Sequence, residues 1–514
     1  MVSSKYQIIQ PLLLAIILSI GLVVGYSLSE THADFSIVKK TNQLGDISLG
    51  VGRVEDVIRV LENNYVDDLP YDQMIEESIE NMLTKLDPFS QYLNPEEYAD
   101  YNEKIEGIYR GIGIESVFIG DTMFVSHVTE NSPAAQSGLL PGCKILYINE
   151  DTIIGADYNI TKVSKLIKSQ DKDHVRLGIQ NKANDVQYVD VGIKNINRPS
   201  ANVGYMINEN SAYLKISRFS ANTYDQVFKT LELISDENGK RPFNLILDLR
   251  NNPGGYLPQA LKILSQLFSE KDKILTYTIG EHRNRKEYRS TGRNFFDINK
   301  MVVLINNYSA SASEIVAGAI QDWDRGILIG ETSYGKGLVQ EIFQLKNGGA
   351  IKLTVARYFT PSGRQIQKPY SVYNDSIYQT DELFKTKLYR RKIENNGGIT
   401  PDYIVKPNFP DYDDQYTSYV SKFILPYVDK ISSSDLSTNP GNSLIDKLQP
   451  YISLIKQAKG IEIDNELLRA ELIYSWYGSL EYNKFKHKKD NLIEKGLEQL
   501  SFEEPVQKLV SNEF

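Results

Sequence analysis

Three serines at alternate positions suggest a serine nucleophile. The stretch NNYSASASEIVAG, residues 306–318, holds Ser309, Ser311 and Ser313 between an apolar run and a segment with helical character. Ser313 fits the N-cap of that helix and Ser309 fits the approaching turn, so Ser311 is the serine left for chemistry. The start of a helix favours a developing negative charge, because its first amides are unpaired and its dipole is positive there.

A lysine offers the base that these serines need. Lys336 lies between two glycines in GETSYGKGLVQEIF, 25 residues after Ser311 (336 − 311), and Gln340 follows four residues later. Residues four apart in a strand point to the same face, so Gln340 can orient the amine without adding a charge. Burial lowers the pKa of a lysine toward the range in which it accepts a proton. A Ser/His/Asp site is disfavoured, because none of the five histidines lies in a comparable motif.

Backbone amides that could hold an oxyanion occur in LDLRNNPGG, residues 247–255. The segment has the pattern of a buried strand that ends in a glycine turn. Each of the three segments taken alone also fits a structural role: a helix cap, an exposed lysine at a strand end, and a strand-to-helix connection. Together they supply a nucleophile, a base and an oxyanion donor within one core.

Alternating strands and helices are predicted around these segments, which indicates an α/β core. The apolar run 243–249 predicts a strand buried on both faces. Helices are expected over 223–234, 257–267 and 313–323, and strands over 212–220, 243–249, 301–307, 327–331, 337–345 and 351–359. Helical spacing of apolar residues also marks the stretch from 50 to 104, with one helix ended by Leu86-Asp87-Pro88.

The amino terminus predicts export. Lys5 precedes the apolar run 12–25, whose length suits both a signal sequence and a short membrane span. The following YSLSETHADF is a weak cleavage site, so an uncleaved anchor is favoured over a cleaved signal peptide. Without a cysteine after the run, a lipoprotein anchor is excluded. We expect a cell-envelope protein on the periplasmic face of the inner membrane.

Composition limits the remaining choices. A chain of 514 residues suggests about three domains. The net charge of −9 argues against nucleic acid, which binds basic faces. One cysteine and five histidines rule out a disulfide framework within the chain and argue against a structural zinc site.

Residues 107–153 resemble a PDZ domain. The resemblance rests on the loop GIGI at 111–114 and on SPAAQSGLLPGCKILYIN, in the order and spacing of that domain, with Cys143 in place of the usual acidic residue. It implies that the glycine loop binds the terminal carboxylate of a peptide while the following strand pairs with the peptide. The implied contact residues are Arg110, Gly111, Ile112, Gly113 and Ile114.

From about residue 50 to 407 the chain resembles the C-terminal processing peptidases, or tail-specific proteases, of the Ser/Lys type. The matching segments are LDPFSQYL, the PDZ segment, LDLRNNPGG, SASASEIVAGAIQD, GKGLVQ, YFTPSGRQIQ and GGITPDYIV, in family order. The resemblance implies that Ser311 is the nucleophile, Lys336 the general base and Gln340 the residue that positions the lysine. It also implies an oxyanion hole made by the amide of Ala312 with that of Gly254 or Gly255, the choice between the glycines staying open. Glu314 and Asp322 also match, and we interpret them as structural supports of the helix.

The resemblance implies a multidomain α+β and α/β protein. The expected parts are an anchor (1–30), a helical region (31–106), a PDZ domain (107–196), a Ser/Lys peptidase core of the ClpP/crotonase-like type (197–410) and a mostly helical extension (411–514). The implied function is a serine endopeptidase that takes protein substrates by exposed, apolar C-termini and uses no metal or cofactor. Its helical ends are compatible with a homodimer. The alternative function is an inactive PDZ scaffold that binds protein C-termini.

Overall fold

The computed structural model describes residues 41–154, 158–168, 173–180, 185–370, 384–408, 425 and 465–511. The chain divides into two compact units, residues 1–78 and 79–514. The anchor predicted at residues 1–30 lies outside the described residues. Across the ranges that are described, no helix combines the length and the apolar character needed to cross a membrane.

Helices dominate the first described part of the chain, as the apolar spacing predicts. They are α2 (Thr41–Asn64), α3 (Tyr71–Thr84) and α4 (Pro95–Glu106), with the short strand β1 (Gln91–Leu93) between the last two. The second helix ends shortly before Asp87-Pro88, where the proline excludes helical geometry from the preceding residue. Strand β1 pairs with β18 (Ala350–Phe359), which fixes the segment 86–93 beside the later part of the chain.

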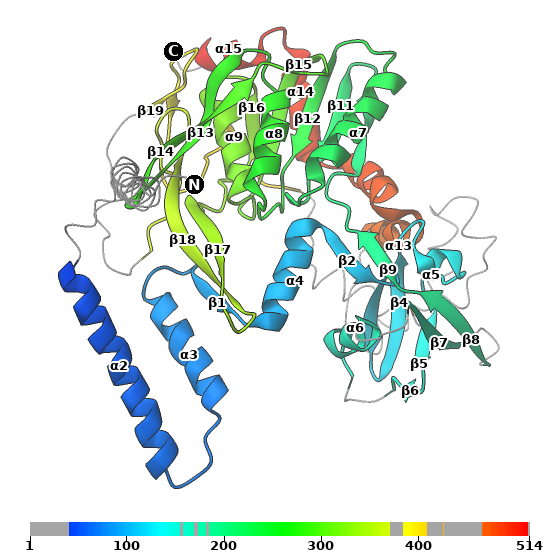
Figure 1. Ribbon diagram of the computed structural model, residues 1–514. Coiled ribbons are helices and arrows are strands. Elements are labelled where there is room, and N and C mark those ends of the chain that lie inside the picture. The colour runs from blue at the N-terminus through cyan, green and yellow to red at the C-terminus, as the bar shows by residue number, and fades with distance from the viewer. Residues whose placement is uncertain are drawn as a thin grey trace, which may run out of the picture. The chain divides into compact units, whose positions relative to one another are not determined.

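Residues 108–197 form a β-rich region with two helices (Figure 1). Its main sheet has the order β3-β4-β5-β7-β8, with β6 paired to β5, and a separate pair joins β2 to β9. Helix α5 begins after Ser132, whose hydroxyl accepts the N–H of Ala135, as predicted. The strands are β2 (Ile108–Gly111), β3 (Ile114–Ile119), β4 (Thr122–Val128), β5 (Lys144–Ile148), β6 (Asp151–Thr152), β7 (His174–Gln180), β8 (Val186–Gly192) and β9 (Lys194–Asn197), and the helices α5 (Pro133–Gln136) and α6 (Ile160–Lys168).

A six-stranded sheet of order β10-β11-β12-β15-β16-β21 is the centre of the protein. All neighbours are parallel except β10 and β11, which confirms the predicted α/β core. Its elements are β10 (Val203–Asn208), β11 (Ser211–Lys215), α7 (Thr223–Glu237), β12 (Phe243–Asp248), α8 (Leu257–Gln266), β15 (Ile298–Ile305), α9 (Ala312–Asp322), β16 (Ile327–Gly330) and β21 (Tyr403–Ile404).

Helices cover both faces of this sheet (Figure 1). Leu245 and Leu247 of β12 point into the core shared with α7, α8 and α9, whereas Ile246 between them points to the opposite face. That second face is covered by helices from the C-terminal region, where Leu492 and Ile493 are buried. These helices are α13 (Asn465–His487), α14 (Asn491–Ser501) and α15 (Pro505–Ser511). The predicted strand buried on both faces is therefore confirmed, and the C-terminal helices complete the core.

A second, antiparallel sheet lies beside the central one. Its order is β1-β18-β13-β14, with β17 paired to β18. This sheet brings β17, which carries Gln340, close to the segment around β1, far away in the sequence. Its remaining members are β13 (Lys271–Gly280), β14 (Arg283–Thr291) and β17 (Leu338–Gln344), and a separate short pair joins β19 (Phe384–Lys385) to β20 (Lys392–Ile393).

Candidate active site

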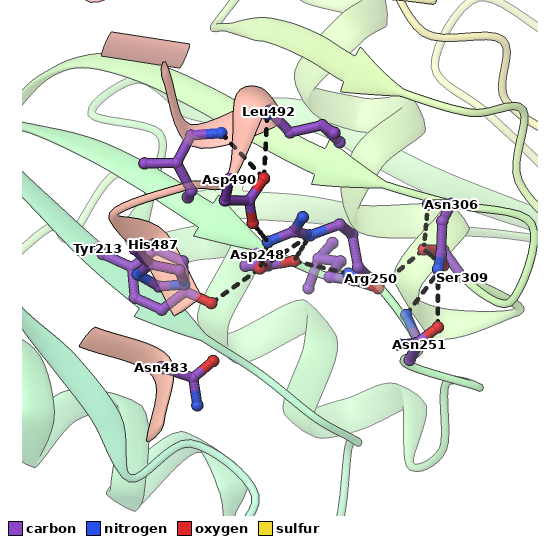
Figure 2. Close-up of polar contacts among 12 residues, drawn as sticks. Tyr213, Asp248, Arg250, Asn251, Asn306, Ser309, Asn483, His487, Asp490 and Leu492 are labelled. Atoms are coloured by element: carbon purple, nitrogen blue, oxygen red, sulfur yellow. Dashed lines mark hydrogen bonds and ion pairs between the residues drawn. The ribbon is translucent and has the colours of Figure 1, made fainter. Parts of the chain in front are cut away.

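Two loops meet where the parallel strands β12 and β15 end. Because neighbouring parallel strands end at the same edge of a sheet, the loops 249–255 and 306–311 lie side by side. Asn251 and Asn306 join them: the backbone N–H of Asn251 donates to Asn306 Oδ1 at 2.9 Å, and Asn306 Nδ2 donates to Asn251 Oδ1 at 2.7 Å (Figure 2). The topology therefore brings the serine segment and the glycine turn to one place.

The hydroxyls of Ser309 and Ser313 hold these two loops together. Ser309 Oγ donates to the carbonyl of Leu249 at 2.8 Å (Figure 2), and Ser313 Oγ donates to the carbonyl of Asn252 at 2.9 Å. The placement of Ser309 on the approach turn agrees with the prediction. The prediction of Ser313 as N-cap is wrong: α9 begins at Ala312, so Ser311 is the N-cap. Ser313 fails as a cap because its hydroxyl is turned to the neighbouring loop.

Ser311 has a backbone conformation that suits an exposed functional side chain. Its φ is +56° and its ψ is −113°, outside the regions that ordinary residues favour. Such strain persists where the surroundings impose it, and it is concentrated at functional sites. The sharp turn at Ser311 separates the end of β15 from α9 and leaves the residue half-buried.

Glu314 binds both of the segments that carry the candidate nucleophile and base. Its Oε2 accepts the backbone N–H of Ser311 and that of Lys336, each at 2.8 Å. Its Oε1 accepts the hydroxyl of Ser333 at 2.5 Å and the N–H of Gly335 at 2.7 Å. The side chain is completely buried. One carboxylate thus fixes the start of α9 and the loop before β17 in a single position.

These contacts require an ionised Glu314. Three of the four donors are backbone N–H groups, which cannot accept a proton. The fourth, Ser333, donates its hydroxyl to Glu314 and accepts the N–H of Ile399 at 2.6 Å. Burial raises the pKa of Glu314 above its ordinary value, while the hydrogen bonds act to lower it. Glu314 supports the start of the helix, as predicted, and its support extends beyond the helix to the lysine loop.

Lys336 and Gln340 are brought together as predicted, although not by the strand periodicity on which that prediction rested. Lys336 Nζ donates to Gln340 Oε1 at 2.8 Å, although Lys336 precedes β17 and only Gln340 lies in it. Gln340 Nε2 donates in turn to the carbonyl of Phe89 at 2.6 Å. The ring of Phe89 lies under the amine, with its centroid 4.7 Å from Nζ. The amine is therefore held by an uncharged amide against an aromatic ring.

This environment shifts the acidity of the lysine. Burial lowers the pKa of Lys336 to about 8, and the positive charge of Lys352 acts in the same direction. The carboxylates of Asp87 and Glu314 oppose the shift. Near neutral pH a useful fraction of this amine is therefore uncharged and can accept a proton. A lysine in water, with its pKa near 10.4, is almost entirely charged at the same pH.

The two glycines of the turn differ in their hydrogen bonds. The N–H of Gly254 donates to Asn252 Oδ1 at 2.9 Å. A Cβ at Gly254 would lie 2.8 Å from the Cβ of Ser311, so only glycine permits this approach. In the part of the chain that the structure describes, the N–H groups of Gly255 and Ala312 have no hydrogen-bond partner. Of the three candidate amides, those of Gly255 and Ala312 are therefore free to bind another acceptor.

Asp87, Phe89 and Asn252 belong to the site although the sequence assigned them no role. Asp87 Oδ1 accepts the N–H groups of Phe89 and Ser90, both at 2.8 Å, and so shapes the turn that presents the Phe89 carbonyl. Asn252 Nδ2 donates to the carbonyl of Ile216 at 2.8 Å, which fixes the glycine turn on β11. These residues lie in LDPFSQYL and LDLRNNPGG, two of the segments that carry the family resemblance. An aspartate before Pro-x-Ser is a turn signal, and it could have revealed the role of Asp87.

The residues predicted to bind a peptide carboxylate lie together in the β-rich region. Arg110 and Gly111 end β2, and Ile114 begins β3, which is an edge strand of its sheet. The carbonyls of Ile112 and Gly113 accept N–H groups of Ala134 and Thr129, so they point into the region. The guanidinium of Arg110 lies 3.4 Å from the carboxylate of Asp173.

Removing the charge of Glu314 tests its role as the common anchor. In Glu314→Gln the side-chain NH2 faces two of the four donors, which lose their acceptor. A buried donor without a partner costs about 1–3 kcal/mol. We expect the melting temperature to fall by about 5–10 °C in a calorimetric scan. Glu341→Gln, which removes only the exposed pair with Arg283, is the control and should change it by less than about 2 °C. Equal shifts in the two variants would contradict this role.

Comparison with known proteins identifies the family. Residues 210–376 match the model of peptidase family S41. A carboxy-terminal-processing protease of Bartonella bacilliformis is 33% identical over 62% of this chain and 72% of its own length. A carboxyl-terminal-processing protease of Synechocystis is 31% identical over 57% of this chain and 68% of its own. The solved photosystem II D1 C-terminal processing protease is 22% identical and covers 70% of this chain and 89% of its own, with a TM-score of 0.38. The chain belongs to the carboxy-terminal-processing proteases of peptidase family S41, which are serine proteases.

Proposed function

We propose that the protein cleaves peptide bonds with Ser311 as nucleophile and Lys336 as general base. One observation carries the proposal: the carboxylate of Glu314 binds the backbone of both residues, so two segments 25 residues apart (336 − 311) are held at one point. The buried amine of Lys336 beside Gln340 supports it further, because a lysine base must lose its charge near neutral pH.

The proposed reaction has two steps. The neutral amine of Lys336 takes the proton of the Ser311 hydroxyl as Oγ attacks the peptide carbonyl, and the amides of Ala312 and Gly255 bind the oxyanion. The resulting ammonium gives the proton to the leaving amine, so an acyl-enzyme forms. Water, deprotonated by the same lysine, then attacks the acyl group, and the lysine returns the proton to Ser311 Oγ as the acyl group leaves. In the structure the amine of Lys336 donates to Gln340. The proposed contact between this amine and the Ser311 hydroxyl would form with substrate bound, because catalytic hydrogen bonds often tighten only in that complex.

Substrate recognition is proposed to use the β-rich region as a PDZ domain. An extended peptide can add to the free edge of β3, and its terminal carboxylate can be bound by the amides of the loop from Arg110 to Ile114. Gly113 has a φ of +87°, and a Cβ there would lie 2.3 Å from the Cβ of Ser132, so the loop conformation depends on glycine. The proposed substrates are proteins with exposed, apolar C-termini.

The location and assembly of the protein are proposed from the sequence. The run 12–25 would export the chain and anchor it to the inner membrane, so that substrates are processed or removed in the cell envelope. A homodimer through the helical ends belongs to the same proposal. The alternative, a PDZ scaffold without catalysis, would bind protein C-termini and leave them intact.

Ser311→Ala and Lys336→Ala test the assignment of nucleophile and base. Each should lower kcat on an unstructured protein with an apolar C-terminus by about 1,000-fold or more, because neither group can be replaced by water at the same position. Lys346→Ala, at an exposed lysine in the turn after β17, is the control and should cleave at the parental rate. Parental rates in either active-site variant would refute the assignment, and binding without cleavage by the parent would favour the scaffold.

The pH dependence of cleavage should follow Lys336. Its pKa is lowered to about 8, and the active form is the neutral amine, so kcat/KM should fall about tenfold per pH unit below 8 and level off above it. Lys352→Met removes a positive charge that helps to lower this pKa, so the midpoint should move to higher pH. A rate that does not change between pH 6 and about 9 would contradict a lysine base.

Recognition of the carboxyl terminus can be tested with the substrate alone. Two copies of one substrate, with a free and an amidated C-terminus, differ only in the charge that the loop 110–114 is proposed to bind. We expect amidation to raise KM at least about tenfold, because charge-assisted hydrogen bonds are lost. Equal KM values for both forms would exclude capture of the carboxylate.

A further inference from the structure

A buried ion pair joins the C-terminal helices to the loop that carries the oxyanion donors. Asp490 lies between α13 and α14 and is 4% exposed. Its Oδ2 lies 2.8 Å from Arg250 Nη2, while its Oδ1 accepts the N–H of Leu492 at 3.0 Å and caps α14 (Figure 2). One side chain therefore starts the helix and reaches the end of β12.

Arg250 has a second carboxylate partner. Its Nε and Nη2 donate to the carboxylate of Asp248 at 3.0 and 2.6 Å. The hydroxyl of Tyr213 donates to the same carboxylate at 2.8 Å (Figure 2). Burial lowers the pKa of His487, beside this group, to about 3 and keeps its ring neutral. The cluster thus contains two carboxylates and one guanidinium, and the positive charge of Lys215 also acts on Asp248. The desolvation of the Asp490 carboxylate is offset by the guanidinium of Arg250 and by the start of α14.

The loop after Arg250 leads directly to the proposed oxyanion hole. Gly254 is four residues further on (254 − 250), and the intervening Asn251 and Asn252 bind the serine loop. Asn252 accepts the backbone N–H of Ala310 at 3.0 Å and the hydroxyl of Ser313 at 2.9 Å, one residue before Ser311 and two after it. A shift of Arg250 would therefore move both the oxyanion donors and the nucleophile.

Contacts with the β-rich region hold α13 before it reaches this cluster. The ring of Tyr474 stacks on that of His127 in β4 with centroids 4.9 Å apart, and its hydroxyl donates to Glu115 of β3 at 3.1 Å. His127 Nδ1 also lies 3.2 Å from the carbonyl of Ser475. The segment 474–490 is thus attached at one end to the sheet that would receive the substrate and at the other to Arg250.

We propose that Asp490 is a positioning residue for catalysis: by binding Arg250 it fixes the loop 250–255, so that the C-terminal helices are part of the catalytic unit. This inference rests on the proposed function. It predicts that the pair contributes more to stabilising the transition state than to binding substrate, because the loop carries the amides that meet the developing oxyanion.

Asp490→Asn separates this role from the helix cap. Asparagine caps a helix about as well as aspartate, but its uncharged side chain gives up the ion pair with Arg250. We expect kcat to fall about tenfold, a fraction of the loss seen when an oxyanion donor is removed, with KM within about twofold of the parent. Affinity for a peptide boronate, whose tetrahedral adduct resembles the transition state, should fall by the same factor as kcat. The pH midpoint of the rate should not move, because Lys336 is unaffected.

Lys300→Met is the matched control. Lys300 Nζ donates to the carbonyls of Leu500 and Phe502, at 3.3 and 2.6 Å, and holds the other end of α14 without touching Arg250. This variant should have a lower melting temperature and a parental kcat. An unchanged kcat in Asp490→Asn, or an equal loss in Lys300→Met, would overturn the proposal. The kcat of each variant is compared with that of the parent protein and with that of Ser311→Ala, which should be inactive. An inactive parent would refute the proposed function itself, whereas the two outcomes above would refute only the role of Asp490.

Discussion

A single buried carboxylate sets the geometry of this site. Glu314 accepts four hydrogen bonds, from Ser311, Ser333, Gly335 and Lys336, and its side chain is not accessible to solvent. Because an unsatisfied buried donor or acceptor is expensive, the two segments can satisfy their amides only in one relative position. The start of α9 and the loop before β17 are therefore fixed together, and the side chains that they carry project from one rigid support.

The layered sheet explains why that support can exist. Parallel strands end at a common edge, and the two loops that follow β12 and β15 need many partners for their backbone groups. Asn251, Asn252, Asn306 and Ser309 supply them with short side chains that reach neighbouring backbone. Helices on both faces keep the strands dry. The C-terminal helices belong to this layering, because Leu492, Ile493 and Leu500 cover the second face of the sheet.

The charge of Lys336 is controlled by a different physical effect, the removal of its amine from water. A neutral amine requires removal from water without a close anion, because a carboxylate in direct contact would keep it charged. Burial, the amide of Gln340 and the ring of Phe89 meet this condition, and the antiparallel sheet makes it possible by pairing β1 and β17 with opposite sides of β18. Glu314 hydrogen-bonds the backbone of Lys336, and its charge opposes the lowering of the amine pKa without preventing it. The same carboxylate can thus place the lysine while its side chain stays free of a salt bridge.

Local pattern determined much of this protein. Apolar runs and glycine turns predict the α/β core, because strand periodicity is a local property. The pairing of Lys336 with Gln340 was also predicted, although Lys336 precedes the strand. The choice among three serines was resolved only in part: Ser313 looked like the cap, but its hydroxyl turns to Asn252, a partner 61 residues away. Three contacts were decided only by the tertiary structure. The N–H of Gly254 donates to the side chain of Asn252, the carbonyl of Phe89 accepts from Gln340, and Asp490 forms an ion pair with Arg250. The last two of these contacts join segments far apart in the chain, and no local spacing encodes which buried groups will find one another when the sheets assemble.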